Sequence, residues 1–248
     1  MRRRRVGPLE LFALVFAVFA VRCSSPTKPG ATLTLTHFTA FGDSITWGTA
    51  SAPGAAGPKG LLSFPITPPS YSYPSQLRTF LAANFPALSV SVANEGWPGE
   101  AVGDGLTRLP TAITETNPDV LLLLDGANDL LGNPSSATTE YIAARLRDMV
   151  RAAKVQRPSI KVLLATFPPQ ARGTIPYDRG AGRDFIPELN QRIAAVANSE
   201  SASVVDLYSA FPTDLRAYIG VDGLHPTELG FTLIAQTFAA RVQQLFVR

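Results

Sequence analysis

Three residues in this sequence have the types and the spacing for nucleophilic catalysis. Ser44 lies in the segment Phe-Gly-Asp-Ser-Ile-Thr-Trp-Gly, directly after the apolar residues 33–41. Asp222 precedes His225 by three residues, so its carboxylate can reach one ring nitrogen while the other nitrogen faces outward. A serine hydroxyl becomes a good nucleophile when a base removes its proton and a third group orients that base. The set predicts acyl-transfer chemistry if the fold brings Ser44 to His225.

Each histidine also has a purely structural interpretation. A carboxylate three residues before His225 is compatible with a helix-capping turn, in which Pro226 begins a helix and the histidine is an ordinary surface residue. The other histidine, His37, lies within a predicted strand, where we expect it to be buried or packed against the sheet. His225 is therefore the candidate base, and the surroundings of Ser44 decide between the two interpretations.

Two glycine-containing loops supply candidates for stabilising a developing oxyanion. Residues 94–100 read Asn-Glu-Gly-Trp-Pro-Gly-Glu, and residues 125–129 read Asp-Gly-Ala-Asn-Asp. Glycine lets a backbone N–H approach a ligand closely, and the side chain of Asn128 carries an amide donor. With the N–H of Ser44, these groups would form an oxyanion hole with three donors. The alternative is simple turn chemistry, which glycine and asparagine both favour.

The pattern of apolar residues predicts the elements that position these loops. Apolar or alternating runs predict five strands, at 33–41, 88–93, 119–124, 160–165 and 203–207. Helical spacing predicts five helices, at 73–85, 103–116, 136–156, 186–199 and 226–246. Such alternation is typical of a parallel sheet with helices on both faces. We predict a flavodoxin-like, three-layer α/β/α fold with a five-stranded parallel sheet in the order 2-1-3-4-5.

A long stretch without helical or strand periodicity follows the serine. Residues 49–72 are rich in Pro, Gly, Ala and Ser, with a few large apolar residues among them. Loops of this length in a compact domain are usually functional or disordered. We expect a lid or wall of a substrate pocket, and the alternative is a solvated insertion.

The residues above resemble the SGNH (GDSL) hydrolase family. The resemblance rests on four ordered blocks and covers the chain from about residue 38 to the C-terminus; the blocks are Gly42-Asp43-Ser44, Gly99, Asn128 and Asp222-x-x-His225-Pro226. Another common serine-hydrolase fold has the same order of serine, acid and histidine, but places its serine in Gly-x-Ser-x-Gly. Thr46 stands here where the last glycine of that motif would be.

The resemblance implies hydrolysis of carboxylic esters through an acyl-enzyme, without a metal or cofactor. It implies Ser44 as the nucleophile, His225 as the base and Asp222 as the residue that orients the base. It also implies oxyanion donors at Ser44, Gly99 and Asn128. Gly99 is preferred to the other glycine of its loop because it lies five residues after an asparagine, as in the family's second block. Asp43 and Asp129 are expected to hold their turns through local hydrogen bonds.

The N-terminal residues indicate export from a bacterial cytoplasm. Four arginines at positions 2–5 precede an apolar run at 11–21, which is typical of a signal peptide and too short for a spanning helix. We therefore predict a signal peptide at 1–22, a flexible tether at 23–32 and one hydrolase domain at 33–248. An uncleaved N-terminal anchor is the alternative for the first segment.

Cys23, directly after the apolar run, is the only cysteine. Its place resembles the lipidated cysteine of bacterial lipoproteins, although Arg22 stands where those signals have a small residue. Lipidation would tether the protein to a membrane. With an incidental cysteine, the protein would be periplasmic or extracellular.

Charge argues against a nucleic-acid partner. The formal net charge is +3, but residues 1–22 hold five arginines and one glutamate, which leaves 17 basic and 18 acidic residues in the rest of the chain. No basic stripe remains for a phosphate backbone. We expect a monomer that acts on a small-molecule, lipid or carbohydrate ester.

Two other function classes remain open at this point. A metallophosphoesterase would need several histidine ligands besides its carboxylates, and only one histidine is a plausible ligand here. A non-catalytic surface-binding protein could use the same fold, because a fold alone does not fix chemistry. Such a protein has no need of a complete serine, histidine and aspartate set. Esters of fatty acids, acetylated sugars, thioesters and lysophospholipids all suit the predicted residues.

Overall fold

The computed structural model describes residues 31–51, 67–174 and 178–248. The predicted signal peptide, residues 23–30 of the predicted tether and residues 52–66 of the predicted lid loop lie outside this part and remain predictions. Near the start of the first described range, Thr32 exchanges two backbone hydrogen bonds with Arg248. None of the helices in the described ranges combines the length and apolar character needed to span a bilayer.

A five-stranded parallel sheet forms the centre of the molecule, in the predicted order β2-β1-β3-β4-β5. The strands are β1 His37–Gly42, β2 Ser91–Gly96, β3 Val120–Leu124, β4 Lys161–Ala165 and β5 Ser203–Val205. The whole of β3 is buried, as its continuous apolar sequence predicts for a strand covered on both faces. The predicted fold class and strand order are confirmed.

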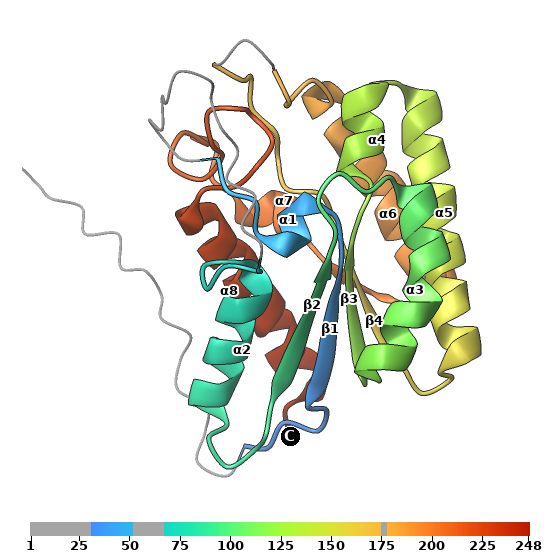
Figure 1. Ribbon diagram of the computed structural model, residues 1–248, viewed down its shortest axis with the longest axis vertical. Helices are drawn as coiled ribbons and strands as arrows, with labels where there is room; N and C mark the ends of the chain where they lie inside the picture. Colours follow the sequence, from blue (N-terminus) through green and yellow to red (C-terminus); the bar gives the residue numbers. More distant parts are fainter. Residues whose placement is uncertain (1–30, 52–66, 175–177) are drawn as a thin grey trace, which may run out of the picture.

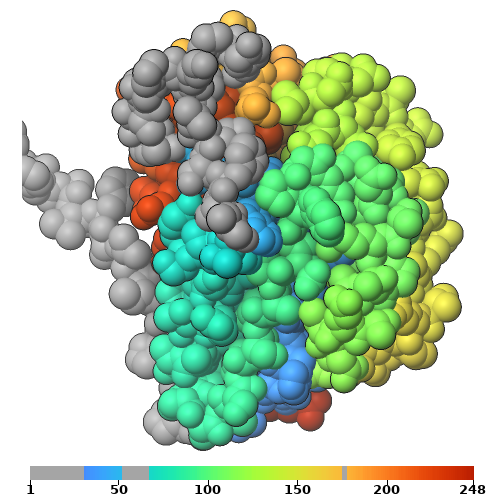
Figure 2. All heavy atoms as spheres, viewed as in Figure 1, coloured from blue at the N-terminus to red at the C-terminus, as the bar shows by residue number. Residues whose placement is uncertain are grey.

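Helices cover both faces of the sheet. They are α1 Ser44–Trp47, α2 Tyr73–Asn84, α3 Val102–Thr116, α4 Ala127–Gly132, α5 Ser136–Gln156, α6 Ile186–Ser199, α7 Leu207–Ala210 and α8 Glu228–Phe246, with a 3₁₀ turn at Arg183–Phe185. On one face α2 packs against α8, and on the other α3, α5 and α6 form a second layer (Figure 1). The space-filling view shows α2 and α3 on either side of the edge strand β2 (Figure 2).

β1 and β2 begin three to four residues later than predicted, because pairing, and not hydrophobicity, decides where a strand begins. β5 ends at Val205, two residues before its predicted end, and β3 and β4 each begin one residue late. Leu33 is apolar and buried, but it forms an isolated antiparallel bridge with Val247 and lies outside β1. The second strand runs later than expected: its register aligns Ser91 with His37 and Gly96 with Gly42. The first three residues of the predicted glycine loop, 94–96, therefore belong to β2.

The predicted environment of His37 is wrong. It is the first residue of β1, and its side chain is exposed beside the carboxylate of Asp119 at 3.3 Å. The strand begins here and not at residue 33, so His37 lies at the rim of the sheet. It is far along the strand from the edge that carries Ser44.

The last helix also begins later than predicted. Pro226 forms an isolated bridge with Ile219, and the N-cap of α8 is Thr227, whose hydroxyl accepts the N–H of Gly230 at 3.2 Å. His225 is therefore not the capping residue. His225 lies in a loop that is hydrogen-bonded to the segment 219–220. The N–H of Gly220 donates to the carbonyl oxygen of His225 at 2.9 Å.

Candidate active site

Ser44 lies at the carboxyl edge of the sheet, where β1 passes into the short helix α1. Asp43 caps that helix: one carboxylate oxygen accepts the N–H of Ile45 at 2.9 Å, and the other accepts the N–H of Ala127 at 3.1 Å. The first bond holds the turn, as expected for Asp43. The second ties the loop after β1 to the loop after β3, so Ser44 is fixed relative to both.

The structure brings the three predicted residues into contact. The hydroxyl oxygen of Ser44 lies 2.9 Å from Nε2 of His225, and Nδ1 of His225 lies 2.6 Å from a carboxylate oxygen of Asp222. An ionised carboxylate can only accept a hydrogen bond, so Nδ1 carries the ring proton and Nε2 is left to accept from the serine. All three side chains are buried. Acyl transfer by a serine requires a hydrogen-bonded chain of this geometry.

Asp222 is held in its ionised form. Burial alone would raise the pKa of this carboxyl, but the His225 ring and the backbone N–H groups of Leu224 and His225 outweigh it and bring the pKa below its ordinary value. The two N–H groups donate to one carboxylate oxygen at 3.1 and 3.0 Å, while the ring takes the other. The tight turn implied by the D-x-x-H spacing therefore both orients the Asp222 carboxylate and stabilises its ionised form.

The loop after β2 leaves one of its two glycines open. The N–H of Gly96 donates to the side chain of Asn94 at 3.0 Å, and a Cβ on this glycine would lie 2.1 Å from the backbone nitrogen of Trp47. Gly99 has a φ of 87°, a conformation that favours glycine, and a Cβ on it would meet no atom of the described residues within 4 Å. Gly96 is therefore closely packed, whereas Gly99 is not packed against any described residue.

Asn128 connects the third loop to the second. It lies in the first turn of α4, after Gly126, which has a φ of 114° at the end of β3. Its amide nitrogen donates to the carbonyl oxygen of Glu100 at 2.8 Å. A side-chain amide has two hydrogens, so one remains after this bond. The neighbouring Asp129 accepts the N–H of Val102 at 2.8 Å, which fixes the start of α3.

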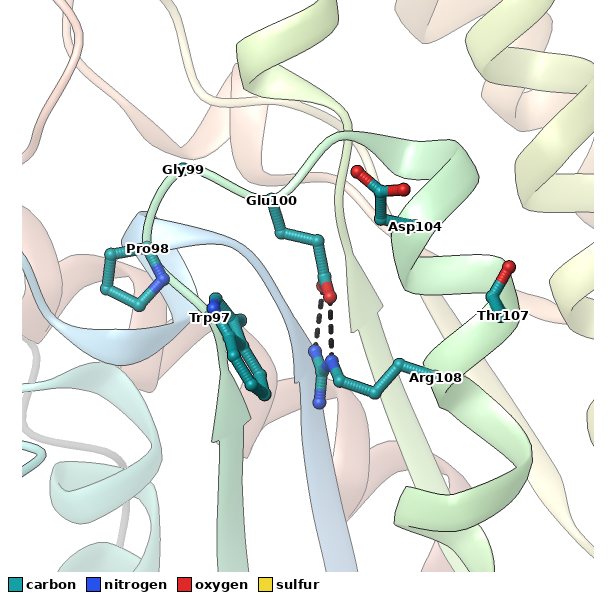
Figure 3. Close-up of a pocket in the computed structure, with 7 residues that line it drawn as sticks. All are labelled: Trp97, Pro98, Gly99, Glu100, Asp104, Thr107 and Arg108. Atoms are coloured by element: carbon teal, nitrogen blue, oxygen red, sulfur yellow. Dashed lines mark hydrogen bonds and ion pairs between the residues drawn. The ribbon is translucent and has the colours of Figure 1, made fainter.

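An ion pair that sequence reasoning missed fixes the glycine loop from below (Figure 3). Two nitrogens of Arg108 donate to the two carboxylate oxygens of Glu100 at 2.7 and 2.8 Å, and one of them also donates to the carbonyl of Glu95 at 3.0 Å. The guanidinium lies 4.1 Å from the ring centroid of Phe41 and 5.4 Å from that of Trp97. No periodic pattern links residues eight apart across a loop and a helix, so the sequence carries no signal for this contact.

Two buried acid groups behind the site, Asp43 and Asp125, have raised pKa values. Burial raises the pKa of Asp43 to about 6, against the opposing effect of its two backbone hydrogen bonds. Burial, followed by the charges of Asp43 and Glu100, raises the pKa of Asp125 well above its ordinary value. The sequence pattern placed residue 125 only as the first residue of the glycine-containing loop after the strand. Its burial follows from the close packing of Gly105, where a Cβ would lie 2.3 Å from the Asp125 carboxylate.

Within residues 31–51, 67–174 and 178–248 no group of three or more His, Cys, Asp or Glu side chains is arranged to hold a metal ion. In particular, His225 already bonds a serine on one nitrogen and a carboxylate on the other.

A family model for GDSL-like lipases and acylhydrolases matches residues 40–233. The match includes the serine, glycine, asparagine and aspartate–histidine positions described above. Because it spans most of the chain, the family assignment does not depend on one motif.

Individual proteins agree with the family model. An acetylxylan esterase from Geobacillus stearothermophilus is 25% identical over 220 residues, which cover 84% of this chain and 94% of that protein. The crystal structure of a lipase/acylhydrolase from Enterococcus faecalis matches with a TM-score of 0.65 at 25% identity, over 86% of this chain and 97% of the other. An aryl esterase from M. smegmatis shares the fold with a TM-score of 0.67 at 23% identity, over 85% and 100% of the two chains.

Proposed function

We propose that this protein works through an acyl-enzyme formed on Ser44. The chain belongs to the GDSL-like lipase/acylhydrolase family and is thus a carboxylic ester hydrolase. The observation that carries this proposal is the continuous hydrogen-bonded chain from the Ser44 hydroxyl through His225 to Asp222. A non-catalytic binding protein would have no use for a buried base aimed at a serine.

In the first half of the reaction the Ser44 oxygen attacks the ester carbonyl carbon while its proton moves to Nε2 of His225. The tetrahedral intermediate collapses, and His225 gives that proton to the departing alkoxide, so a neutral alcohol leaves and an acyl-enzyme remains. In the second half a water molecule attacks the acyl carbon and gives its proton to His225. Collapse returns the proton to Ser44 and releases the acid. Asp222 stays ionised throughout and stabilises the imidazolium.

We assign the oxyanion to the backbone N–H groups of Ser44 and Gly99 and to the side-chain amide of Asn128. Two contacts support the assignment. The competing N–H of Gly96 is already bonded to Asn94, whereas no atom of the described residues would lie within 4 Å of a Cβ on Gly99. The amide of Asn128 bonds the carbonyl of the residue after Gly99, so the two donors belong to one connected unit. Donors fixed before the reaction stabilise the developing charge without reorganisation.

For the substrate we propose a short-chain ester, with acetyl esters of carbohydrates as the first candidates. The acetylxylan esterase from Geobacillus stearothermophilus supports this choice, because its match covers nearly its whole length.

Replacing Ser44 with alanine tests the proposed function. We expect Ser44→Ala to lower the hydrolysis of ethyl acetate by at least about 10⁴-fold, since the covalent route is lost. The matched control is Ser89→Ala, because Ser89 is exposed at the opposite edge of the sheet. Circular dichroism would show that both variants fold.

Two further measurements separate the proposal from its rivals. The native protein should react with a serine-directed phosphonate at Ser44, detected by mass spectrometry of the labelled peptide. Full activity of Ser44→Ala would refute the assignment. Inhibition by a strong chelator, reversed by added metal, would favour a metallophosphoesterase instead.

A further inference from the structure

A pocket lies beside the glycine loop, between that loop and the face of α3 (Figure 3). Its volume of about 470 Å³ is within the range of small-ligand sites. Gly99 is part of its wall and is also the proposed second oxyanion donor. A ligand in this pocket would therefore touch the same turn that contacts the reacting carbonyl.

Trp97 provides a fixed aromatic surface in this pocket. Its side chain is 59% exposed, although large aromatic groups usually gain stability from burial. Its backbone N–H donates to the carbonyl of Gly42 at 2.8 Å, and its ring lies 5.4 Å from the Arg108 guanidinium. The backbone hydrogen bond and the contact with Arg108 thus position Trp97, while more than half of its surface remains open to a ligand.

The charges of the pocket exclude an anionic ligand. Arg108 is the pocket's cation, and it is already paired with both carboxylate oxygens of Glu100 and with a carboxylate oxygen of Glu95. Asp104 adds an exposed carboxylate on the α3 wall. A phosphate, sulfate or uronate group would find no available positive charge among the described residues that line the pocket and would face a net negative wall.

The remaining polar groups suit a ligand with many hydroxyl groups. Asp104 and Thr107 are three residues apart on α3, so their side chains lie on the same helix face. Figure 3 shows both side chains on the α3 side of the pocket, across from Trp97. A carboxylate accepts hydrogen bonds from two hydroxyl groups. The Thr107 hydroxyl donates to the carbonyl of Gly103 at 3.2 Å, and its oxygen can still accept a hydrogen bond from a ligand hydroxyl. An apolar acyl chain would displace water from the Asp104 carboxylate without replacing its hydrogen bonds.

We propose that this pocket binds a sugar ring of a neutral glycan, next to the acylated position that Ser44 attacks. The apolar C–H face of the ring packs on Trp97, and the ring hydroxyls bond Asp104 and Thr107. This inference rests on the proposed ester hydrolysis and specifies its substrate class. The pocket increases the affinity for a longer saccharide and takes no part in the chemical step.

The first test compares two esters of different length. The readout is the ratio of kcat/KM for acetylated xylotetraose to kcat/KM for ethyl acetate, which is too small to reach both sites. We expect Trp97→Ala to lower this ratio at least about tenfold, mainly through a higher KM for the saccharide, as for removal of an aromatic anchor from a binding site. Trp97→Phe, which keeps a ring, should restore most of it.

Val155→Ala is the control for removal of an exposed apolar side chain. Val155 is 82% exposed near the C-terminal end of α5, far from the pocket. This variant should leave the ratio of the two kcat/KM values unchanged. Asp104→Asn should lower the ratio less than Trp97→Ala does, because the amide keeps one acceptor and adds donors.

The second test measures binding without turnover. The chain has two tryptophans, Trp47 and Trp97, so fluorescence can report on this pocket. Added xylotetraose should change the emission of the Ser44→Ala protein in a saturable way. The same titration of a protein that also carries Trp97→Phe should show no change from the remaining Trp47.

Three outcomes would overturn the pocket assignment. An unchanged ratio in Trp97→Ala would show that the ring does not bind the saccharide. An equal loss on both esters would show that Trp97 only positions the loop. A loss confined to long-chain p-nitrophenyl esters would identify an acyl-chain site. In each case hydrolysis that depends on Ser44 would persist, whereas failure of the proposed function would abolish that dependence itself.

Discussion

Asp222 and Asp125 are both completely buried, and both lie toward the catalytic edge of the sheet, but they meet opposite surroundings. Asp222 accepts three hydrogen bonds, two from backbone N–H groups and one from the His225 ring. Neither carboxylate oxygen of Asp125 has a partner in good hydrogen-bond geometry within the described residues. The pKa of Asp222 is lowered and that of Asp125 is raised, each from the same ordinary value.

The contrast shows that burial alone does not decide the charge of an acid. Burial penalises the ionised form of both groups, and donors that meet the carboxylate reverse that penalty only at Asp222. The fold thus favours the charged form of the buried carboxylate beside His225 and the neutral form of the buried carboxylate at the end of β3. Glu100 is also buried, and both of its carboxylate oxygens accept hydrogen bonds from one residue, Arg108.

Asp222→Asn should give the largest effect, because it removes the charge and leaves the size unchanged. The amide cannot stabilise the imidazolium and can hold His225 in the wrong tautomer. We expect kcat to fall by about 10³–10⁴-fold with little change in KM. Steady-state kinetics on ethyl acetate measure kcat and KM. Asp214→Asn, at an exposed position, is the control and should retain full activity. A loss below tenfold would show that the acid does not assist His225.

Arg108→Met should have the next largest effect, a loss of stability, since it would turn Glu100 into a second unpartnered buried carboxylate. Removing one partner of a largely buried ion pair costs about 3 kcal/mol, and here the cost should appear in the free energy of unfolding. The same change frees the loop that carries Gly99, so kcat should also fall. Urea denaturation at neutral pH measures the stability.

The control for this variant is Arg216→Met, which breaks the pair between Arg216 and Asp214 on the surface. Surface pairs contribute little, so no measurable change in stability is expected. Equal stability of the two variants would contradict the role assigned to Arg108.

Asp125→Asn should have the smallest effect and the opposite sign. The folded pKa of Asp125 lies above the unfolded value of about 3.8, so the folded state binds its proton more tightly than the unfolded state does. This group therefore lowers stability progressively as pH rises from about 4 toward the folded pKa. Because the amide does not ionise, the variant should be more stable than the native protein at pH 7 by ~1 kcal/mol or more.

Urea denaturation from pH 4 to pH 8 measures the difference between Asp125→Asn and the native protein. The extra stability of Asp125→Asn over the native protein should be small near pH 4 and grow as the pH rises. Part of the native decline should persist in the variant, because Asp43 has a pKa raised to about 6 and contributes with the same sign up to that pH. A variant that is destabilised at all pH values would show that Asp125 has a partner after all.

The sequence predicted much of the fold because its signals are local. The bounds of α5 and α6 agree with the helical spacing at 136–156 and 186–199, and the buried strand β3 follows from its continuous apolar run. Strands β1 and β2 were placed less well, since their ends depend on register with neighbours. The short helices α1, α4 and α7 are only four to six residues long, which is too short for a periodic pattern.

The same distinction applies to the site. The turn that joins Asp222 to His225 is readable from a spacing of three residues, and the glycine loops are readable from composition. The pairing of Glu100 with Arg108 and the isolation of Asp125 are not, because each depends on how α3 packs against the sheet. The exposure of His37 depends on where β1 starts, and it was predicted wrongly for that reason.

By itself the sequence determined the types of the reacting groups, the order of the strands and the edge at which the loops meet. Only the tertiary structure decided the contact between Ser44 and His225, which are 181 residues apart, and the protonation state of each buried acid. The physical reason is that periodicity and turn chemistry are properties of neighbouring residues. Distances and charges inside the core are set by elements far apart along the chain.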